Sequence, residues 1–103
     1  MAKSAPVLTL VTYTPKKGKE ADLLALVEKH WPALQKVGLV TAEPAKVWRA
    51  TDKRKGTVAF VELFSWRDGE ASGIAHQMPE VMAVWEPMGG VMEEMRIEQL
   101  EPV

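Results

Sequence analysis

The chain has 103 residues, which gives room for one domain with a single hydrophobic core. Its apolar fraction of 47% and charged fraction of 26% are those of an ordinary globular protein. The formal net charge of −1 gives no electrostatic reason to expect a nucleic acid or an anionic membrane surface as a partner. Because the chain has no cysteine, thiol catalysis, disulfides and thiolate metal sites are excluded.

The expected localisation and domain extent rest on three kinds of segment that we do not find in the sequence: a signal peptide, a membrane span and a linker. Residues 1–6 include no apolar core of a signal peptide, and no segment approaches the roughly 18 apolar residues that a membrane span needs. No linker, repeat or low-complexity segment divides the chain. We therefore expect a cytoplasmic protein without membrane association, made of one domain over residues 1–103 with an ordered core from about residue 6 to 101.

The first third of the chain predicts a strand followed by a helix. Residues 7–13 (VLTLVTY) are rich in β-branched and aromatic side chains, and Thr14-Pro15 closes the strand. Residues 19–37 have helical spacing, in which Pro32 predicts a kink or a short new helix and Gly38 a C′ residue. One face of this helix carries an apolar stripe of Leu23, Leu26, Val27, Leu34 and Val37, with His30 inside it and Trp31 at its edge.

The middle of the chain predicts a β-hairpin. Residues 42–51 form its weaker strand, and Pro44 near the start favours an edge position or a bulge. Residues 52–56 (DKRKG) are a charged turn whose basic run we expect to be solvated. Residues 57–66 (TVAFVELFSW) are the strongest strand pattern in the chain.

The last third predicts a helix in two parts and a final strand. Asp68 is placed to cap the first part, and Pro79 restarts the helix. The apolar stripe of the second part comprises Val81, Val84, Trp85, Met88, Val91 and Met92. Pro87 and Gly89-Gly90 weaken its last turns, and residues 95–100 (MRIEQL) alternate as a strand.

This order of elements predicts the α+β class, as a ferredoxin-like β-α-β-β-α-β domain with a four-stranded antiparallel sheet and its helices on one face. The other face of such a sheet should be polar. Strand 57–66 departs from this rule, because Val58, Phe60, Phe64 and Trp66 point one way while Ala59, Val61 and Leu63 point the other. We therefore expect a homodimer through the sheet face. The alternative is that this strand is only central and twisted.

The segment from residue 60 to 89, FVELFSWRDGEASGIAHQMPEVMAVWEPMG, resembles the antibiotic-biosynthesis-monooxygenase-like branch of the dimeric α+β barrel superfamily. The matching pieces are a strand ending in Trp66, then Glu70-Ala71, then His76 before Met78-Pro79, then an apolar helix with Trp85. The resemblance implies a homodimer made by packing two sheets, with a pocket between sheet and helices. It also implies oxidation of a small aromatic or polyketide-like molecule without flavin, metal or haem. The haem-degrading branch of the superfamily needs an asparagine on the first strand and a tryptophan on the second helix. The chain does not fit this pattern, since residues 7–13 contain no asparagine and Trp66 ends a strand.

Three polar residues are the candidate catalytic groups. His30 lies on the inner stripe of its helix, and Glu62 shares a strand face with aromatic side chains, where a carboxylate must find a partner or take up a proton. The structural, non-catalytic alternatives are that His30 is a hydrogen-bonded core residue and that Glu62 pairs with Arg49 across the hairpin. Helical spacing places His76 at the rim, whereas the resemblance implies a recurrent histidine in the pocket at this position.

The remaining predictions concern the pocket walls, metals and function. We expect the ligand to contact Trp31, Phe64, Trp66, Met82, Trp85 and Met88, because rigid indoles beside flexible thioethers suit a flat apolar ligand. We expect no metal site, since with two histidines the ligand set would need carboxylates at unsuitable spacing. The first hypothesis is a cofactor-independent monooxygenase-like enzyme. The alternatives are a non-catalytic small-molecule binding or sensing module and a purely structural homodimer.

Overall fold

A computed structural model describes residues 5–103 of the chain. The first four residues, part of the N-terminal segment without a signal-type apolar run, lie outside the described residues. The elements in chain order are β1 (Val7–Pro15), α1 (Glu20–Lys36), β2 (Lys46–Asp52), β3 (Thr57–Trp66), α2 (Ala71–Ala75), α3 (Pro79–Val91) and β4 (Met92–Gln99). This arrangement confirms the predicted ferredoxin-like fold, with the second helix divided at Pro79 as expected.

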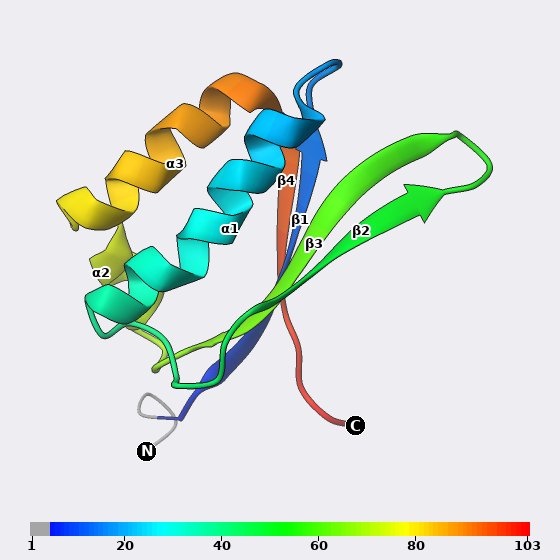
Figure 1. Cartoon of the computed structure of the whole chain (residues 1–103). Coiled ribbons are helices and arrows are strands. Elements are labelled where there is room, and N and C mark those ends of the chain that lie inside the picture. Colours follow the sequence, from blue (N-terminus) through cyan, green and yellow to red (C-terminus); the bar gives the residue numbers. More distant parts are fainter. Residues whose placement is uncertain (1–4) are drawn as a thin grey trace.

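The four strands form one antiparallel sheet in the order β2-β3-β1-β4. Helices α1, α2 and α3 all lie on the same side of this sheet, and the β2–β3 hairpin projects beyond them (Figure 1). The central strands β1 and β3 pair so that Val11 lies opposite Glu62 and Tyr13 opposite Phe60. Strand β2 lies at an edge, which agrees with the presence of Pro44 just before it.

Helix α1 is a single helix from Glu20 to Lys36, although Pro32 lies inside it. The expectation of a new helix at Pro32 is therefore wrong, and α1 continues for one more turn. Gly38 ends it with a φ of +74°, a conformation that glycine adopts without a steric penalty. The backbone N–H of Gly38 donates to the carbonyl of Gln35 at 3.0 Å, as a C′ residue does.

Three strands have different limits from those predicted, and the first of them, β1, extends to Pro15 instead of ending at residue 13. Strand β2 begins at Lys46 rather than at residue 42, because the chain reaches the sheet only after Pro44. Strand β4 begins at Met92 rather than at residue 95, directly after α3 ends at Val91. Met92 thus belongs to the strand, and the Gly89-Gly90 pair stays within α3. The strand β3 has the limits that the sequence predicts.

The core lies between the sheet and the helices. Phe60, Glu62, Phe64 and Trp66 of β3 are buried on this side, together with Leu23, Val27 and Leu34 of α1 and Val81, Val84 and Met88 of α3. On the opposite face of β3, Ala59, Val61 and Leu63 are only half-buried, because no element of the described chain covers them. None of the helices within residues 5–103 has the length and hydropathy to cross a bilayer.

Candidate functional site

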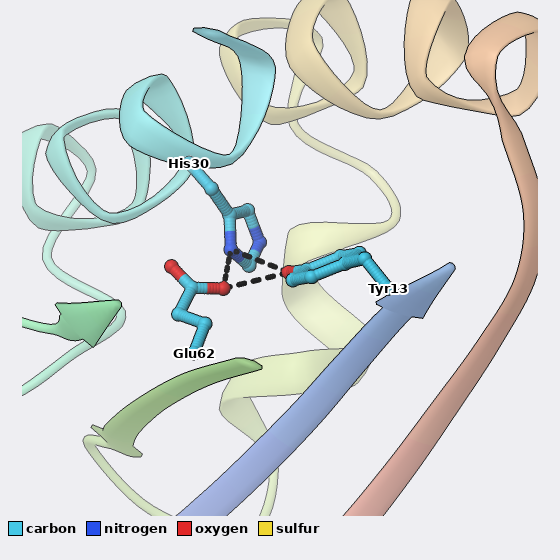
Figure 2. A network of polar contacts seen from close by, with 3 residues as sticks. All are labelled: Tyr13, His30 and Glu62. Carbon is cyan, nitrogen blue, oxygen red and sulfur yellow. Dashed lines mark hydrogen bonds and ion pairs between the residues drawn. The ribbon is translucent and has the colours of Figure 1, made fainter. Parts of the chain in front are cut away.

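A buried network joins three polar side chains from three elements. Glu62 on β3 is fully buried, while Tyr13 on β1 and His30 on α1 are 2% and 4% exposed. The Tyr13 hydroxyl donates a hydrogen bond to Glu62 Oε1 at 2.6 Å, and His30 Nδ1 lies 2.8 Å from the same oxygen. Figure 2 shows both contacts converging on one carboxylate oxygen. Two of the candidate catalytic residues, His30 and Glu62, are therefore in direct contact, and Tyr13 is the third member of the network.

The chemistry of the three groups assigns the protons. An ionised carboxylate only accepts hydrogen bonds, so Nδ1 of His30 carries the proton that it donates to Glu62. The 3.4 Å between the Tyr13 oxygen and His30 Nδ1 is then the separation of two donors that share one acceptor. In a neutral imidazole of this tautomer, Nε2 holds a lone pair and is the basic atom.

The Tyr13 hydroxyl is held in its protonated form. Burial, the negative charge of Glu62 and the hydrogen bond to that carboxylate raise the pKa of Tyr13 far above its ordinary value. Tyr13 therefore acts as a permanent hydrogen-bond donor at any working pH. It is not a candidate for the base of a reaction.

Two atoms of the network have no hydrogen-bond partner among the described residues. They are Oε2 of Glu62 and Nε2 of His30, and both are buried. Buried polar atoms without a partner are uncommon, because leaving one costs about 1–3 kcal/mol. In Figure 2 the Nε2 side of the ring faces away from Glu62. Nε2 is therefore the nitrogen of His30 that no described residue engages.

A cavity of about 310 Å³ lies beside this network, within the volume range of small-molecule sites. Six residues predicted for the site line it: His30, His76, Phe64, Trp66, Trp85 and Met88. Eight further residues complete the lining: Thr9, Val11, Tyr13, Ser72, Met92, Met95, Ile97 and Gln99. The walls are thus mainly apolar, with a few polar groups.

The structure does not bring Trp31, Met82 or Glu62 to the cavity wall. Trp31 and Met82 are half-buried, and the Trp31 indole N–H is buried without a partner among the described residues. Trp31 follows His30 directly on α1, so that about 100° of helical rotation separates the two side chains. Glu62 lies behind the wall and is bonded to two residues that line the cavity, His30 and Tyr13.

The two histidines occupy different positions around Trp85. His30 is inside, with its ring centroid 5.9 Å from that of Trp85 and 5.6 Å from that of Phe64. His76 is exposed, and its ring meets Trp85 edge-on at 4.8 Å. The Nδ1 of His76 donates to the carbonyl of Ser72 at 2.8 Å. His76 therefore lies at the rim, as helical spacing predicts, and still lines the cavity, as the resemblance implies.

The alternative pairing of Glu62 with Arg49 is wrong. The register of the hairpin places Arg49 opposite Phe60, with its guanidinium 5.4 Å from the centre of that ring. Arg49 also forms an ion pair with Glu20 at 3.7 Å. Within residues 5–103, no group of three or more histidine, aspartate or glutamate side chains is arranged to hold a metal ion.

No family model matches the sequence, and no curated protein matches it. Solved structures do match. A conserved protein of unknown function and possible oxidoreductase from Bacteroides thetaiotaomicron aligns with a TM-score of 0.73 at 10% identity, over 94% of this chain and 97% of that one. An antibiotic biosynthesis monooxygenase aligns with a TM-score of 0.70 at 14% identity, over 94% and 98%.

SnoaB, a cofactor-independent oxygenase from Streptomyces nogalater, aligns with a TM-score of 0.66 at 13% identity, over 96% of this chain and 97% of that one. Sequence identities this low establish a shared fold. The chain therefore has the fold of antibiotic biosynthesis monooxygenase-like proteins, and the resemblance drawn from residues 60–89 is confirmed at the level of the fold.

Proposed function

We propose that this protein is a cofactor-independent monooxygenase-like enzyme for a small hydroxylated aromatic molecule, with His30 as the general base. One observation carries the proposal. His30 is buried at the cavity wall with Nδ1 bonded to Glu62 and with Nε2 free of any partner among the described residues. A histidine oriented by a carboxylate at one nitrogen presents the other nitrogen as a base of fixed direction. The fold shared with a cofactor-independent oxygenase supports the same chemistry.

The reaction needs one proton transfer and molecular oxygen. Nε2 of His30 takes the proton of the aromatic hydroxyl, and the electron-rich anion passes one electron to O2. Recombination of the two radicals forms a carbon–oxygen bond at the ring carbon para to the hydroxyl. The hydrogen of that ring carbon then leaves as a proton while the O–O bond breaks, so that the carbon becomes a carbonyl. The second oxygen takes up this proton and the one returned by His30, and leaves as water. Phenol and O2 thus give quinone and water, without flavin, metal or haem.

The cavity suits this sequence of steps. Phe64, Trp66, Trp85 and Met88 give it apolar walls, which exclude water from the radical pair and strengthen the interaction of the anion with the imidazolium. Glu62 stabilises the imidazolium that forms at His30, because its charge lies 2.8 Å from Nδ1. His76 at the rim is a further polar group of the cavity wall that a ligand would meet.

Oxygen consumption tests this function directly. A panel of mono- and dihydroxynaphthalenes and hydroxylated anthrones is offered to the purified protein, and quinone formation and uptake of one ¹⁸O atom from ¹⁸O2 are measured. We expect His30→Ala to lower the rate about a hundredfold or more, since general base catalysis commonly contributes that much. Lys29→Ala is the matched control, because Lys29 is the exposed neighbour on α1. An active His30→Ala variant would remove His30 as the base.

We also propose that the protein works as a homodimer through the outer face of the sheet. On this face Leu10, Val61 and Leu63 of the central strands are half-buried, and Leu8 and Trp48 are 38% and 49% exposed. A charged rim borders them on β4, where Arg96 and Glu98 form an ion pair. A second copy offers the same apolar patch and the same rim, so two sheets can pack face to face. A cytoplasmic location stays a prediction from the sequence.

Molar mass in solution tests the dimer. We expect the native chain to have twice the monomer mass in light scattering after gel filtration. Leu63→Lys, which places a charge in the centre of the patch, should give a folded monomer. Lys53→Glu at the exposed hairpin turn is the control and should leave the dimer intact. A native chain of monomer mass would overturn this part of the proposal and leave the cavity chemistry untouched.

A further inference from the structure

The hydroxyl of Tyr13 is bonded to the buried carboxylate of Glu62, a contact that packing of the ring alone would not require. Its hydroxyl lies 2.6 Å from the carboxylate oxygen that also accepts the bond from His30, while the second carboxylate oxygen has no partner among the described residues. Both donors thus compete for the electron density of Oε1. The side chain also lines the cavity, and its hydroxyl is 3.4 Å from Nδ1 of His30.

We propose that Tyr13 is a positioning residue that fixes Glu62 Oε1 against His30 and keeps the His30–Glu62 pair from taking up a proton at neutral pH. The inference rests on the proposed role of His30 as a base. A base is useful only while its lone pair is free, and a buried histidine beside a carboxylate tends to be protonated. By donating to Oε1, Tyr13 withdraws part of the charge that would otherwise attract a proton to the pair.

Tyr13 and Glu62 should act in opposite directions. Without the Tyr13 hydroxyl, the carboxylate loses one of its two donors, so the pair binds a proton more readily, wherever within the pair that proton resides. Without the charge of Glu62, the imidazolium loses its counter-ion in a buried site, so His30 binds a proton less readily. A residue that served only to fill space would not produce this pair of opposite effects.

The other titratable groups around His30 are few. From β1 and β3 the groups that face it are Tyr13 and Glu62. Directly after α2, the exposed His76 lies across the Trp85 ring, and neither α3 nor β4 contributes a titratable side chain to the cavity lining. The proton balance at His30 therefore depends mainly on the two hydrogen-bonded partners.

The test is a pH titration by long-range ¹H–¹⁵N correlation NMR, which reports the tautomer and the protonation of each imidazole. The chain has only two histidines, so His76→Gln assigns the two signals. The native protein is compared with Tyr13→Phe and Glu62→Gln, two variants that keep the size of the side chain. His76, exposed and not bonded to the network, is the control within each sample.

We expect the native His30 to show the Nδ1–H tautomer at neutral pH. In Tyr13→Phe the midpoint of proton uptake at His30 should rise by about one pH unit, the size expected when a charged acceptor loses a donor. In Glu62→Gln it should fall, while the midpoint of His76 stays unchanged in both. A His30 midpoint that stays or falls in Tyr13→Phe, or a His30 that does not titrate in any of the three proteins, overturns the proposal.

This experiment separates the inference from the proposed function. It needs no substrate and no turnover, so an inactive native protein would remove the enzyme proposal while leaving the NMR result to stand. If oxygen uptake is found, the acid limb of the pH profile of kcat/KM should move in Tyr13→Phe in the same direction as the NMR midpoint. A limb that moves the opposite way would contradict the role of Tyr13 in the reaction.

Discussion

Phe60 and Val61 are neighbours on β3, yet they face two different environments. Phe60 is 1% exposed between the sheet and the helices, beside Glu62 and Phe64. Val61 is half-buried on a face that no described element covers. The helix side holds the cavity and the buried polar network, whereas the outer side holds an apolar patch bordered by the charged rim on β4. One apolar face of β3 thus packs against the helices of the same chain, whereas the other face is left without a covering element among the described residues.

The largest effect is expected when the side chains of Phe60 and Val61 are each truncated to alanine. Phe60→Ala should lower the free energy of unfolding by about 3–5 kcal/mol, because it empties a buried ring site. Val61→Ala should cost about 1 kcal/mol in the separate chain, where the native side chain is only half-buried, and more in the proposed homodimer, where a second copy covers it. Urea unfolding followed by circular dichroism gives both values. Similar losses in the two variants would mean that the two faces are equally covered.

The dependence of the free energy of unfolding on protein concentration tests whether a second copy covers the outer face. If folding and pairing are coupled, each tenfold increase in protein concentration should raise the free energy of unfolding by about 1.4 kcal/mol at about 25 °C. Leu63→Lys should remove this dependence, since its unfolding would involve one chain only. A native protein whose urea midpoint does not change with concentration would contradict the proposed pairing.

The buried network on the helix side should respond to alkaline pH through Tyr13, the only tyrosine in the chain. Because its pKa is raised in the folded state, its contribution to stability is fully present below the unfolded value near pH ~10 and is lost above it. Stability should fall there by up to about 1.4 kcal/mol per pH unit more than in Tyr13→Phe. Tyrosinate absorbance should appear only as the protein unfolds. Ionisation near pH ~10 in the folded state would contradict the buried hydrogen bond.

The smallest effect is expected outside both faces, at the turn before α2. The Asp68 carboxylate accepts two hydrogen bonds, one from the Arg67 side chain at 2.8 Å and one from the backbone N–H of Glu70 at 3.0 Å. These bonds hold the pKa of Asp68 below its ordinary value. The stabilisation is present above the unfolded value and is lost as the pH falls through the folded one. Asp68→Asn should therefore lower the Tm slightly at neutral pH, and the difference should vanish in acid. A constant difference would assign the effect to something other than charge.

Much of the fold could be predicted because periodicity and turn residues act locally. The limits of β3, the helix restart at Pro79 and the edge position of β2 all follow from side-chain alternation and from proline geometry. The limits of β4 could not be predicted, because Met92 fits a helical stripe and a strand equally well. Only the pairing of Met92 with Pro15 on β1 decides between the two.

The candidate site was predictable in part for the same reason. Glu62 amid aromatic residues and His30 on an apolar stripe each indicated a buried polar partner. Tyr13 was missed because an aromatic residue in a strand is ordinary, although a buried tyrosine hydroxyl needs an acceptor and alternation places Tyr13 on the face of Val11. Met95 and Ile97 were missed because their orientation depends on the register of β4 with β1, which no local pattern contains.

The projecting β2–β3 hairpin gives a convenient handle for measuring distances in solution (Figure 1). Its turn, around Lys53, is exposed, and the chain has no cysteine, so Lys53→Cys supplies a single thiol for each copy. A spin label attached there would report one separation in a pair of chains. Dipolar spectroscopy could then read the relative orientation of two sheets directly, and a chain that stays alone would give no dipolar signal at all.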